Sequence, residues 1–169
     1  RCAPFIYGAV LDLIEISKNT VVMEACSAST NPVVVDGRVV HSCAFNAINV
    51  AIIADLLAIV IAHVANAIER RIAQLFRGDI TGLPDFLAES TPVGSMIEGY
   101  VATAIVTRLR ALATPHSIHS LPVSGLQEDV IPNSGEATLR IVEALELLGE
   151  LISIEEKVVA SASALKTKH

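Results

Sequence analysis

The sequence predicts an all-α fold, a bundle of long helices with one short β-hairpin near residues 33–40. Apolar residues make up 52% of the 169-residue chain, yet aromatic residues reach only 4% and Trp is absent, so the apolar excess is aliphatic. Apolar residues recur at helical spacing over several long stretches, and Gly and Pro gather between those stretches. Long helices joined by short polar loops define a helical bundle. We expect residues 1–169 to form a single helical segment.

The first elements are two helices and the hairpin. A helix is expected over residues 4–17, because Pro is tolerated in the first turn of a helix, where its missing N–H has no helical partner. A shorter helix is expected over residues 20–28, before Asn31-Pro32 interrupts the pattern. Residues 33–40 place Asp-Gly between two β-branched runs, which is typical of a tight primed hairpin turn.

A long helix without Gly or Pro is expected from about residue 45 to residue 76, and its apolar part could suggest a membrane span. Such a span needs about 20 apolar residues. The apolar run is slightly shorter, contains Asp55, and is followed by Glu69-Arg70-Arg71. The sequence therefore favours the central helix of a large bundle over a membrane span, and we expect no membrane association.

The second half of the chain continues with helices and loops. A Gly- and Pro-containing loop is expected over residues 78–84, then a helix over residues 96–113 and a Ser- and Pro-rich loop over residues 115–125. Another helix is expected from about residue 133 to residue 152, and a last one over residues 155–165.

Charge and cysteine content exclude some classes of protein. The net charge is −6 and the longest basic run is Arg70-Arg71, whereas a nucleic-acid-binding protein needs a clustered basic face. The cysteines Cys2, Cys26 and Cys43 are odd in number and form no Cys-x-x-Cys pair, which favours free thiols in a reducing cytoplasm. The sequence shows neither the charged n-region nor the small-residue cleavage site of a signal peptide, and we expect a cytoplasmic protein.

The apolar content also predicts partners. The mean hydropathy of the 169-residue chain is +0.57. A chain this apolar has more apolar surface than one small domain can bury against itself. We therefore expect these helices to be buried against other chains or against a further segment. The chain opens at Arg1 rather than Met, and we expect it either to be processed or to begin inside a longer protein.

Eight short motifs follow one another along nearly the whole chain, and their joint order and spacing are informative although no single motif is. They are Arg1-Cys2-Ala3-Pro4, Asn31-Pro32, Phe45, Glu69-Arg70-Arg71, Gly82-Leu83-Pro84-Asp85-Phe86-Leu87, Leu112-Ala113-Thr114-Pro115-His116-Ser117, Ser120-Leu121-Pro122-Val123-Ser124 and Gln127-Glu128-Asp129. In order and spacing they resemble the carboxyl-terminal part of the histidine and phenylalanine ammonia-lyases, the aromatic amino acid ammonia-lyase family.

The resemblance implies a long-helix bundle of the ammonia-lyase type, assembled as a tetramer in which three subunits contribute to each active site. It also implies a methylidene-imidazolone prosthetic group, which the family makes from an Ala-Ser-Gly tripeptide. No Ala-Ser-Gly occurs in the chain. The group is thus expected from a segment outside it, either a preceding segment or a separate amino-terminal chain. No metal is expected, because His116 and His119 have no third ligand nearby in the sequence.

The resemblance further implies roles for four residues. Arg1 matches the Arg that pairs with the substrate carboxylate, for which a guanidinium fork is suited. Phe45 matches the aromatic residue that walls the pocket beside the prosthetic group. Gln127 would line the pocket, and Glu128 would be catalytic, since a carboxylate near the substrate amino group can accept or shuttle its proton. The plain structural alternatives are a surface Arg, a core aromatic residue and a carboxylate at a helix amino terminus.

Two functions remain open at this point. One is an ammonia-lyase-like enzyme that removes ammonia from histidine or an aromatic amino acid to give an α,β-unsaturated acid, incomplete as this chain alone. The other is a non-catalytic homologue or assembly subunit of the same fold, favoured by Cys43-Ala44 where the family has Gly-Asn, and by the altered residues 130–133. An aminomutase shares the architecture of the first.

Overall fold

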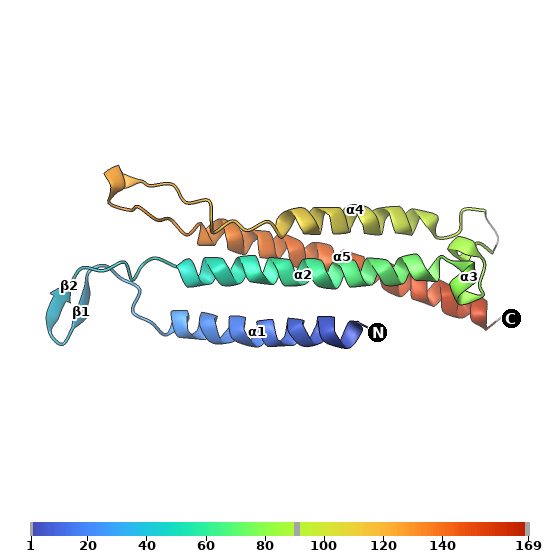
Figure 1. Ribbon diagram of the computed structural model, residues 1–169, viewed down its shortest axis with the longest axis horizontal. Helices are drawn as coiled ribbons and strands as arrows, with labels where there is room; N and C mark the ends of the chain where they lie inside the picture. The colour runs from blue at the N-terminus through green and yellow to red at the C-terminus, as the bar shows by residue number, and fades with distance from the viewer. Residues whose placement is uncertain (1, 90–91, 168–169) are drawn as a thin grey trace.

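The computed structural model describes residues 2–89 and 92–167. Its elements follow the chain as α1 (Ala3–Ala25), β1 (Val33–Val35), β2 (Arg38–Val40), α2 (Ile48–Leu75), α3 (Gly78–Thr81), η1 (Asp85–Leu87), α4 (Met96–Leu112), η2 (Ser124–Leu126) and α5 (Ser134–Lys166) (Figure 1). The prediction of an all-α bundle with one hairpin near residues 33–40 is confirmed.

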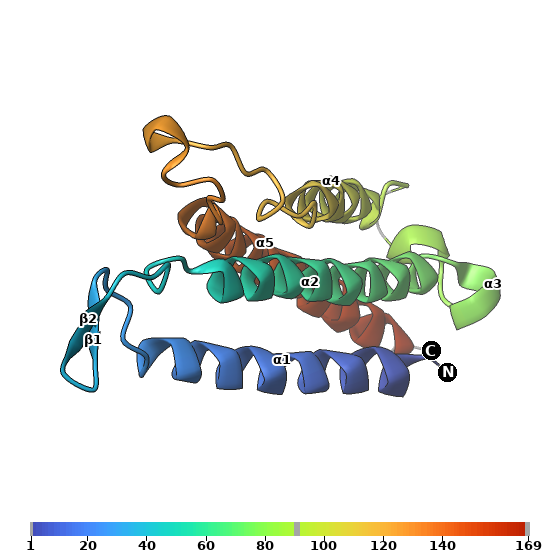
Figure 2. The same cartoon turned by 60° about the vertical axis from the view of Figure 1, so that its left-hand side comes forward.

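Helix α2 lies at the centre of the bundle and packs against α1, α4 and α5. Figures 1 and 2 show α1 on one side of α2 and α4 on the other, while α5 crosses behind. Fully buried alanines line these contacts, namely Ala51 and Ala65 on α2, Ala102 on α4 and Ala144 on α5. Small side chains let helix axes approach closely. Larger side chains such as Ile72, Leu109 and Leu151 fill the space that is left.

Two expected helix breaks are absent. Residues 4–17 and 20–25 belong to one helix, α1, in which Thr20 Oγ1 donates to the Ile16 carbonyl at 3.0 Å and so fits inside a helix. Residues 26–28 lie beyond its carboxyl end. The expected helices over residues 133–152 and 155–165 are likewise one helix, α5, in which Ser153 donates to the Gly149 carbonyl at 3.1 Å. Hydroxyl side chains can bond the preceding turn as readily as they can end a helix.

The hairpin has the predicted turn. Val33 pairs with Val40 and Val35 pairs with Arg38, in antiparallel register. Asp36 and Gly37 both have positive φ, at 50° and 74°. A primed two-residue turn requires positive φ at both central residues, and Asp-Gly is among the pairs that accept it.

Helix α2 carries both the apolar and the polar contacts expected of a core helix. By length and composition it could span a membrane, yet half of its most apolar 18-residue window is buried inside the bundle. Near its carboxyl end, Arg70 pairs with Glu69 and Arg71 pairs with Glu155 of α5. Glu69-Arg70-Arg71 is therefore an ion-paired part of the helix.

Much apolar surface is not covered by the described residues. Ser17 is the only buried residue of α1, and Phe5 and Leu11 on that helix are 81% and 67% exposed. On α5, Leu139 and Leu145 are 66% and 54% exposed. Large exposed apolar patches on soluble proteins mark contact sites. The exposed apolar residues of α1 and α5 are therefore candidates for contacts with other chains or segments.

Candidate active site

Two of the predicted site segments, the one with Phe45 and the one with Gln127 and Glu128, meet at one end of the bundle. The segment that precedes α2 and the loop between α4 and α5 both lie at the end where the hairpin projects (Figures 1 and 2). Asn46 Nδ2 donates to the Val130 carbonyl at 2.9 Å and joins the two segments directly. Phe45 therefore lies next to a residue that contacts the loop carrying Gln127 and Glu128.

Phe45 is presented by a tight turn rather than by a helix. The Asn46 amide donates to the Cys43 carbonyl at 2.8 Å, and the Ala44 amide donates to Ser42 Oγ at 3.3 Å. Because α2 begins only at Ile48, Phe45 stands outside the helix, and its side chain is 47% exposed. Phe45 thus belongs neither to α2 nor to the core of this chain, and its ring is available as a pocket wall.

Gln127 and Glu128 stand in the projecting part of the α4–α5 loop, which we call the loop tip, residues 121–129. The tip is exposed throughout and is closed on itself by one antiparallel bridge, in which the Val123 amide donates to the Glu128 carbonyl at 2.9 Å. Since α5 begins only at Ser134, Glu128 is not in its first turn. The alternative of a carboxylate at a helix amino terminus is thus wrong for Glu128.

The loop tip has a strained backbone. Ser124, Gly125 and Leu126 have φ values of 52°, 64° and 73° in succession, and only Gly adopts such angles without cost. Left-handed conformations in non-glycine residues cost of order 1 kcal/mol or more each, and they cluster at functional sites. The strain immediately precedes Gln127, and no sequence signal predicts it at Ser124 or Leu126.

The base of the same loop is held firmly, and we call residues 116–120 and 130–133 the loop neck. Within the neck, Asn133 Nδ2 donates to the His119 carbonyl at 2.5 Å and the Ile131 amide donates to Ser120 Oγ at 2.8 Å. Asp55 of α2 accepts hydrogen bonds from the His116 and Ser117 amides, each at 2.8 Å. Asp55 therefore joins the neck to the central helix of the bundle.

The ionisation of Asp55 reflects these contacts. Burial alone would raise the pKa of its carboxyl group, but hydrogen bonds from the Ser117 hydroxyl and from the His116 and Ser117 amides, with the nearby His116 charge, outweigh burial and lower the pKa below its ordinary value of 3.8. Asp55 is consequently ionised at neutral pH. The sequence indicated only that a charge interrupts an apolar run at this position.

Arg1 lies outside the described residues. Of the other predicted site residues, the structure brings the Phe45 turn and the Gln127-Glu128 loop to one end of the bundle. Among residues 2–89 and 92–167, no three His, Cys, Asp or Glu side chains gather as a metal site would require. His116 and His119 stack edge to face, with ring centroids 5.4 Å apart.

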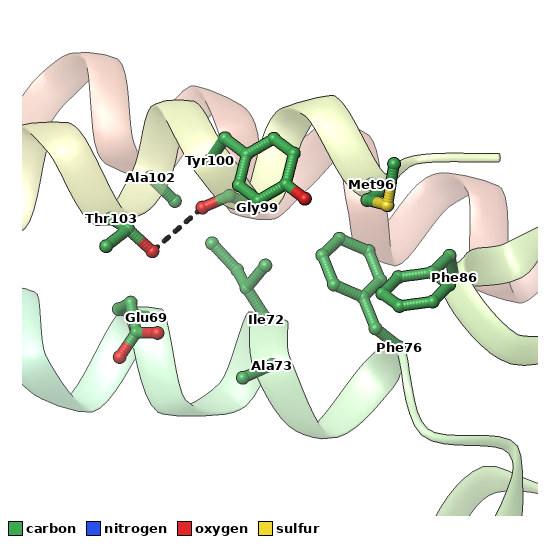
Figure 3. A pocket seen from close by; sticks show the side chains of 10 residues that line it. All are labelled: Glu69, Ile72, Ala73, Phe76, Phe86, Met96, Gly99, Tyr100, Ala102 and Thr103. Atoms are coloured by element: carbon green, nitrogen blue, oxygen red, sulfur yellow. Dashed lines mark hydrogen bonds between the residues drawn. The ribbon is translucent and has the colours of Figure 1, made fainter. Parts of the chain in front are cut away.

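A separate pocket lies between α2 and α4, and its described lining includes none of Phe45, Gln127 and Glu128. Figure 3 shows Glu69 at one side of it and the rings of Phe76, Phe86 and Tyr100 around the rest. The Phe76 and Phe86 ring centroids are 6.0 Å apart. Because the Glu69 carboxylate already pairs with Arg70, this pocket offers little beyond an apolar cleft to a ligand.

Comparison with solved structures sets the class of protein. The structure matches histidine ammonia-lyase from Trypanosoma cruzi with a TM-score of 0.91 and 30% identity, over 98% of this chain and 34% of that one. It matches the phenylalanine aminomutase of Pantoea agglomerans with a TM-score of 0.93 and 30% identity, again over 98% of this chain and 34% of that one. The fold is that of the ammonia-lyases and aminomutases.

Sequence comparison gives the family. The chain is 38% identical over 157 residues to a probable histidine ammonia-lyase from Thermoplasma volcanium, a match that covers 92% of this chain and 32% of the relative. The model of the aromatic amino acid lyase family matches residues 1–169, and the chain belongs to that family. It spans about a third of the length of the curated relatives that it matches.

Proposed function

We propose that this chain is the carboxyl-terminal part of an ammonia-lyase that acts on histidine or an aromatic amino acid. In the reaction the Cα–N bond breaks, a β-proton leaves, and a double bond forms between Cα and Cβ as ammonia departs. The observation that carries the proposal is the hydrogen bond from Asn46 to the Val130 carbonyl. It joins the turn that presents Phe45 to the loop that presents Gln127 and Glu128, which are the segments that the family resemblance assigns to one pocket.

Each residue contributes what its chemistry allows. Glu128 is an exposed carboxylate at the loop tip, suited to hold the substrate amino group and to take up its proton. Gln127, its neighbour, adds an amide that can both donate and accept hydrogen bonds. The exposed ring of Phe45 forms an apolar wall for the substrate. Arg1 would bind the substrate carboxylate through its planar guanidinium.

The prosthetic group of the family fits beside these residues but does not originate from them. The half-exposed ring of Phe45 is free to form a wall next to a planar methylidene-imidazolone. The chain contains no Ala-Ser-Gly from which that group could form. When bound, the group supplies the electrophilic centre of the reaction. We propose that a preceding segment or a separate amino-terminal chain provides it, together with the base that removes the β-proton.

Partner chains follow from the uncovered surface. Phe5, Leu11 and Met23 on α1 and Leu139 and Leu145 on α5 are all more than half exposed in this chain. Burial of apolar surface contributes about 25 cal/mol per Å², so covering these faces stabilises an assembly substantially. We propose a tetramer in which such faces are buried. A cytoplasmic location is in keeping with the three free cysteines, Cys2, Cys26 and Cys43.

The test is an assay of the complete protein, purified with any chain that accompanies it, on histidine, phenylalanine and tyrosine. Ultraviolet absorbance reports urocanate or a cinnamate as it forms. Accumulation of one of these acids, lost in a Glu128→Gln variant, supports a lyase. No turnover of the three, with an intact Ala-Ser-Gly segment present, rejects the lyase in favour of a non-catalytic homologue.

An aminomutase is the second candidate, because the match to a phenylalanine aminomutase is as close as the match to a histidine ammonia-lyase, at 30% identity in both cases. An aminomutase returns the amino group to the β-carbon instead of releasing it. Proton NMR of the same reaction mixtures distinguishes the two, since a β-amino acid has a methylene group next to its carboxylate, which neither the substrate nor an unsaturated acid has. Free ammonia measured in parallel should match the unsaturated acid for a lyase.

A further inference from the structure

We propose that Asp55 is a positioning residue for the reaction: its carboxylate holds the loop neck on α2 so that the loop tip presents Gln127 and Glu128 to the substrate. The inference rests on the proposed function. Asp55 lies about two turns inside α2, and its carboxylate bonds to the loop, so it acts through the loop rather than on the substrate.

The Asp55 carboxylate binds the loop through both of its oxygens. Asp55 Oδ1 accepts from the His116 amide and Oδ2 accepts from the Ser117 amide, both at 2.8 Å. Two successive amides bound to the two oxygens of one carboxylate fix the orientation of the peptide unit between them as well as its position. Hydrogen bonds to an ionised acceptor are also stronger than those to a neutral one.

A carboxylate at position 55 does not favour the packing of the bundle. Asp55 is 8% exposed in the middle of an apolar helix, where burying a charge is unfavourable unless it is well paired. Asp is also a poor residue for a helix interior. An aliphatic side chain would suit α2 better on both counts. The hydrogen bonds that compensate Asp55 all come from the loop, at His116 and Ser117.

The hydrogen bonds of the loop neck connect Asp55 to the loop tip. Asn133 Nδ2 donates to the His119 carbonyl and the Ile131 amide donates to Ser120 Oγ, so the two segments of the neck are held together. The tip beyond them, residues 121–129, is exposed along its whole length. Its orientation relative to the bundle is therefore set at the neck, where Asp55 holds the first segment at His116 and Ser117 and Asn46 holds the second at Val130.

The first test is independent of activity. In the complete protein, an Asp55→Asn variant keeps the shape of the side chain but replaces one acceptor oxygen by an NH2 group. One of the two hydrogen bonds from the His116 and Ser117 amides is then lost. Millisecond hydrogen–deuterium exchange should then quicken at least about tenfold at the His116 and Ser117 amides. It should also quicken at the Val123 amide, which bonds to the Glu128 carbonyl in the tip. Faster exchange at the His116 and Ser117 amides with no change at Val123 would show that Asp55 orders only the neck, and it would overturn the proposal.

The second test uses kinetics. Small misplacements of a reacting group can cost about 100-fold in rate, and Asp55→Asn is expected to lower kcat about 10- to 100-fold with KM changed much less. In a Glu128→Gln background the same substitution should cost less than about threefold, because the group that it positions is already lost. Losses that multiply independently would overturn the proposal.

Leu151→Ala is the matched control, since Leu151 is fully buried in the core and lies in the middle of α5, more than four turns beyond the start of that helix at the neck. It should lower Tm while leaving the Val123 exchange rate and the kcat of the folded enzyme unchanged. If Leu151→Ala reproduces the Asp55→Asn effects, general destabilisation explains them and the positioning role is rejected. If the complete protein acts on none of the three amino acids, the proposed function fails, and the exchange measurement alone decides whether Asp55 orients the tip.

Discussion

The Arg71 guanidinium binds the Glu155 carboxylate through two hydrogen bonds, from Nε at 2.6 Å and from Nη2 at 3.0 Å. Its third nitrogen, Nη1, donates to the Tyr7 hydroxyl at 2.8 Å. The hydrogen bonds to Glu155 and Tyr7 outweigh burial and raise the pKa of Arg71, which stays charged. One side chain on α2 thereby joins α1 and α5, and only a guanidinium has donors in the directions that both partners need.

Arg71→Lys is expected to lower stability by about 1 kcal/mol, because Lys keeps the charge but cannot serve Glu155 in two places and Tyr7 in a third. The partial exposure of Arg71 limits the loss. Thermal unfolding of the complete protein measures it. Arg108→Lys is the control, since its pairing with Glu143 is more exposed and should matter less than about 0.5 kcal/mol. Equal shifts in the two variants would contradict the role given to Arg71.

The helices and the hairpin could be predicted because each depends on neighbours in the sequence. The Asp36-Gly37 turn has the positive φ values that its residues favour, and the apolar run of α2 is helical as expected. The breaks expected inside α1 and α5 were wrong because they were also inferred from local residues alone. Thr20 and Ser153 can either end a helix or bond its preceding turn, and the packing of the helix decides between them.

The site was predicted only in part. Short motifs indicated Phe45, Gln127 and Glu128, but the contacts that assemble them, from Asn46 to Val130 and from Asp55 to His116, join residues 84 and 61 positions apart. No local pattern encodes such a contact. One signal was nevertheless available, because a lone carboxylate in an apolar helix needs a partner from elsewhere in the chain.

Glu128→Gln should lower kcat about 100- to 10,000-fold, the range typical of losing a group that transfers a proton. The amide has nearly the same shape but cannot accept a proton at neutral pH. Steady-state kinetics on the best substrate measures the effect. Glu136→Gln, an exposed carboxylate in the first turn of α5, is the control and should leave kcat unchanged. A Glu128→Gln enzyme with normal kcat would remove Glu128 from the catalytic role.

Asn46→Ala removes the hydrogen bond between the Phe45 turn and the loop neck, and we expect it to cost about 1 kcal/mol in stability. Activity should fall further than that stability loss explains, because Phe45 and the loop are no longer held together. Thermal unfolding and kcat/KM together provide the measurement. Asn19→Ala, on the exposed face of α1, should change neither. Full activity in Asn46→Ala would show that the two segments need no such contact.

The lowered pKa of Asp55 makes its contribution to stability depend on pH. Between its folded and unfolded pKa values the unfolded chain binds more protons, so stability rises with pH there. The contribution is fully present above about pH 5 and is lost as pH falls from about 4 through the lower folded pKa. The Tm difference between the parent and Asp55→Asn should therefore be constant from about pH 5 to pH 7 and narrow below about pH 4. A gap that widens on acidification would contradict the pKa direction.

The exposed leucines of α5 give the most direct test of assembly. A charge at Leu145, which is 54% exposed in this chain, costs little if water surrounds it and several kcal/mol if a neighbouring chain covers it. Leu145→Glu is therefore expected to reduce the molar mass of the complete protein, measured by light scattering after gel filtration, and to lower activity with it. The neighbouring exposed carboxylate provides the control, because Glu146→Gln should leave the assembly intact. If Leu145→Glu, and Met23→Glu on α1, both keep the parent mass and Tm, these apolar faces lie in solvent, and the proposed tetramer must be built from other surfaces.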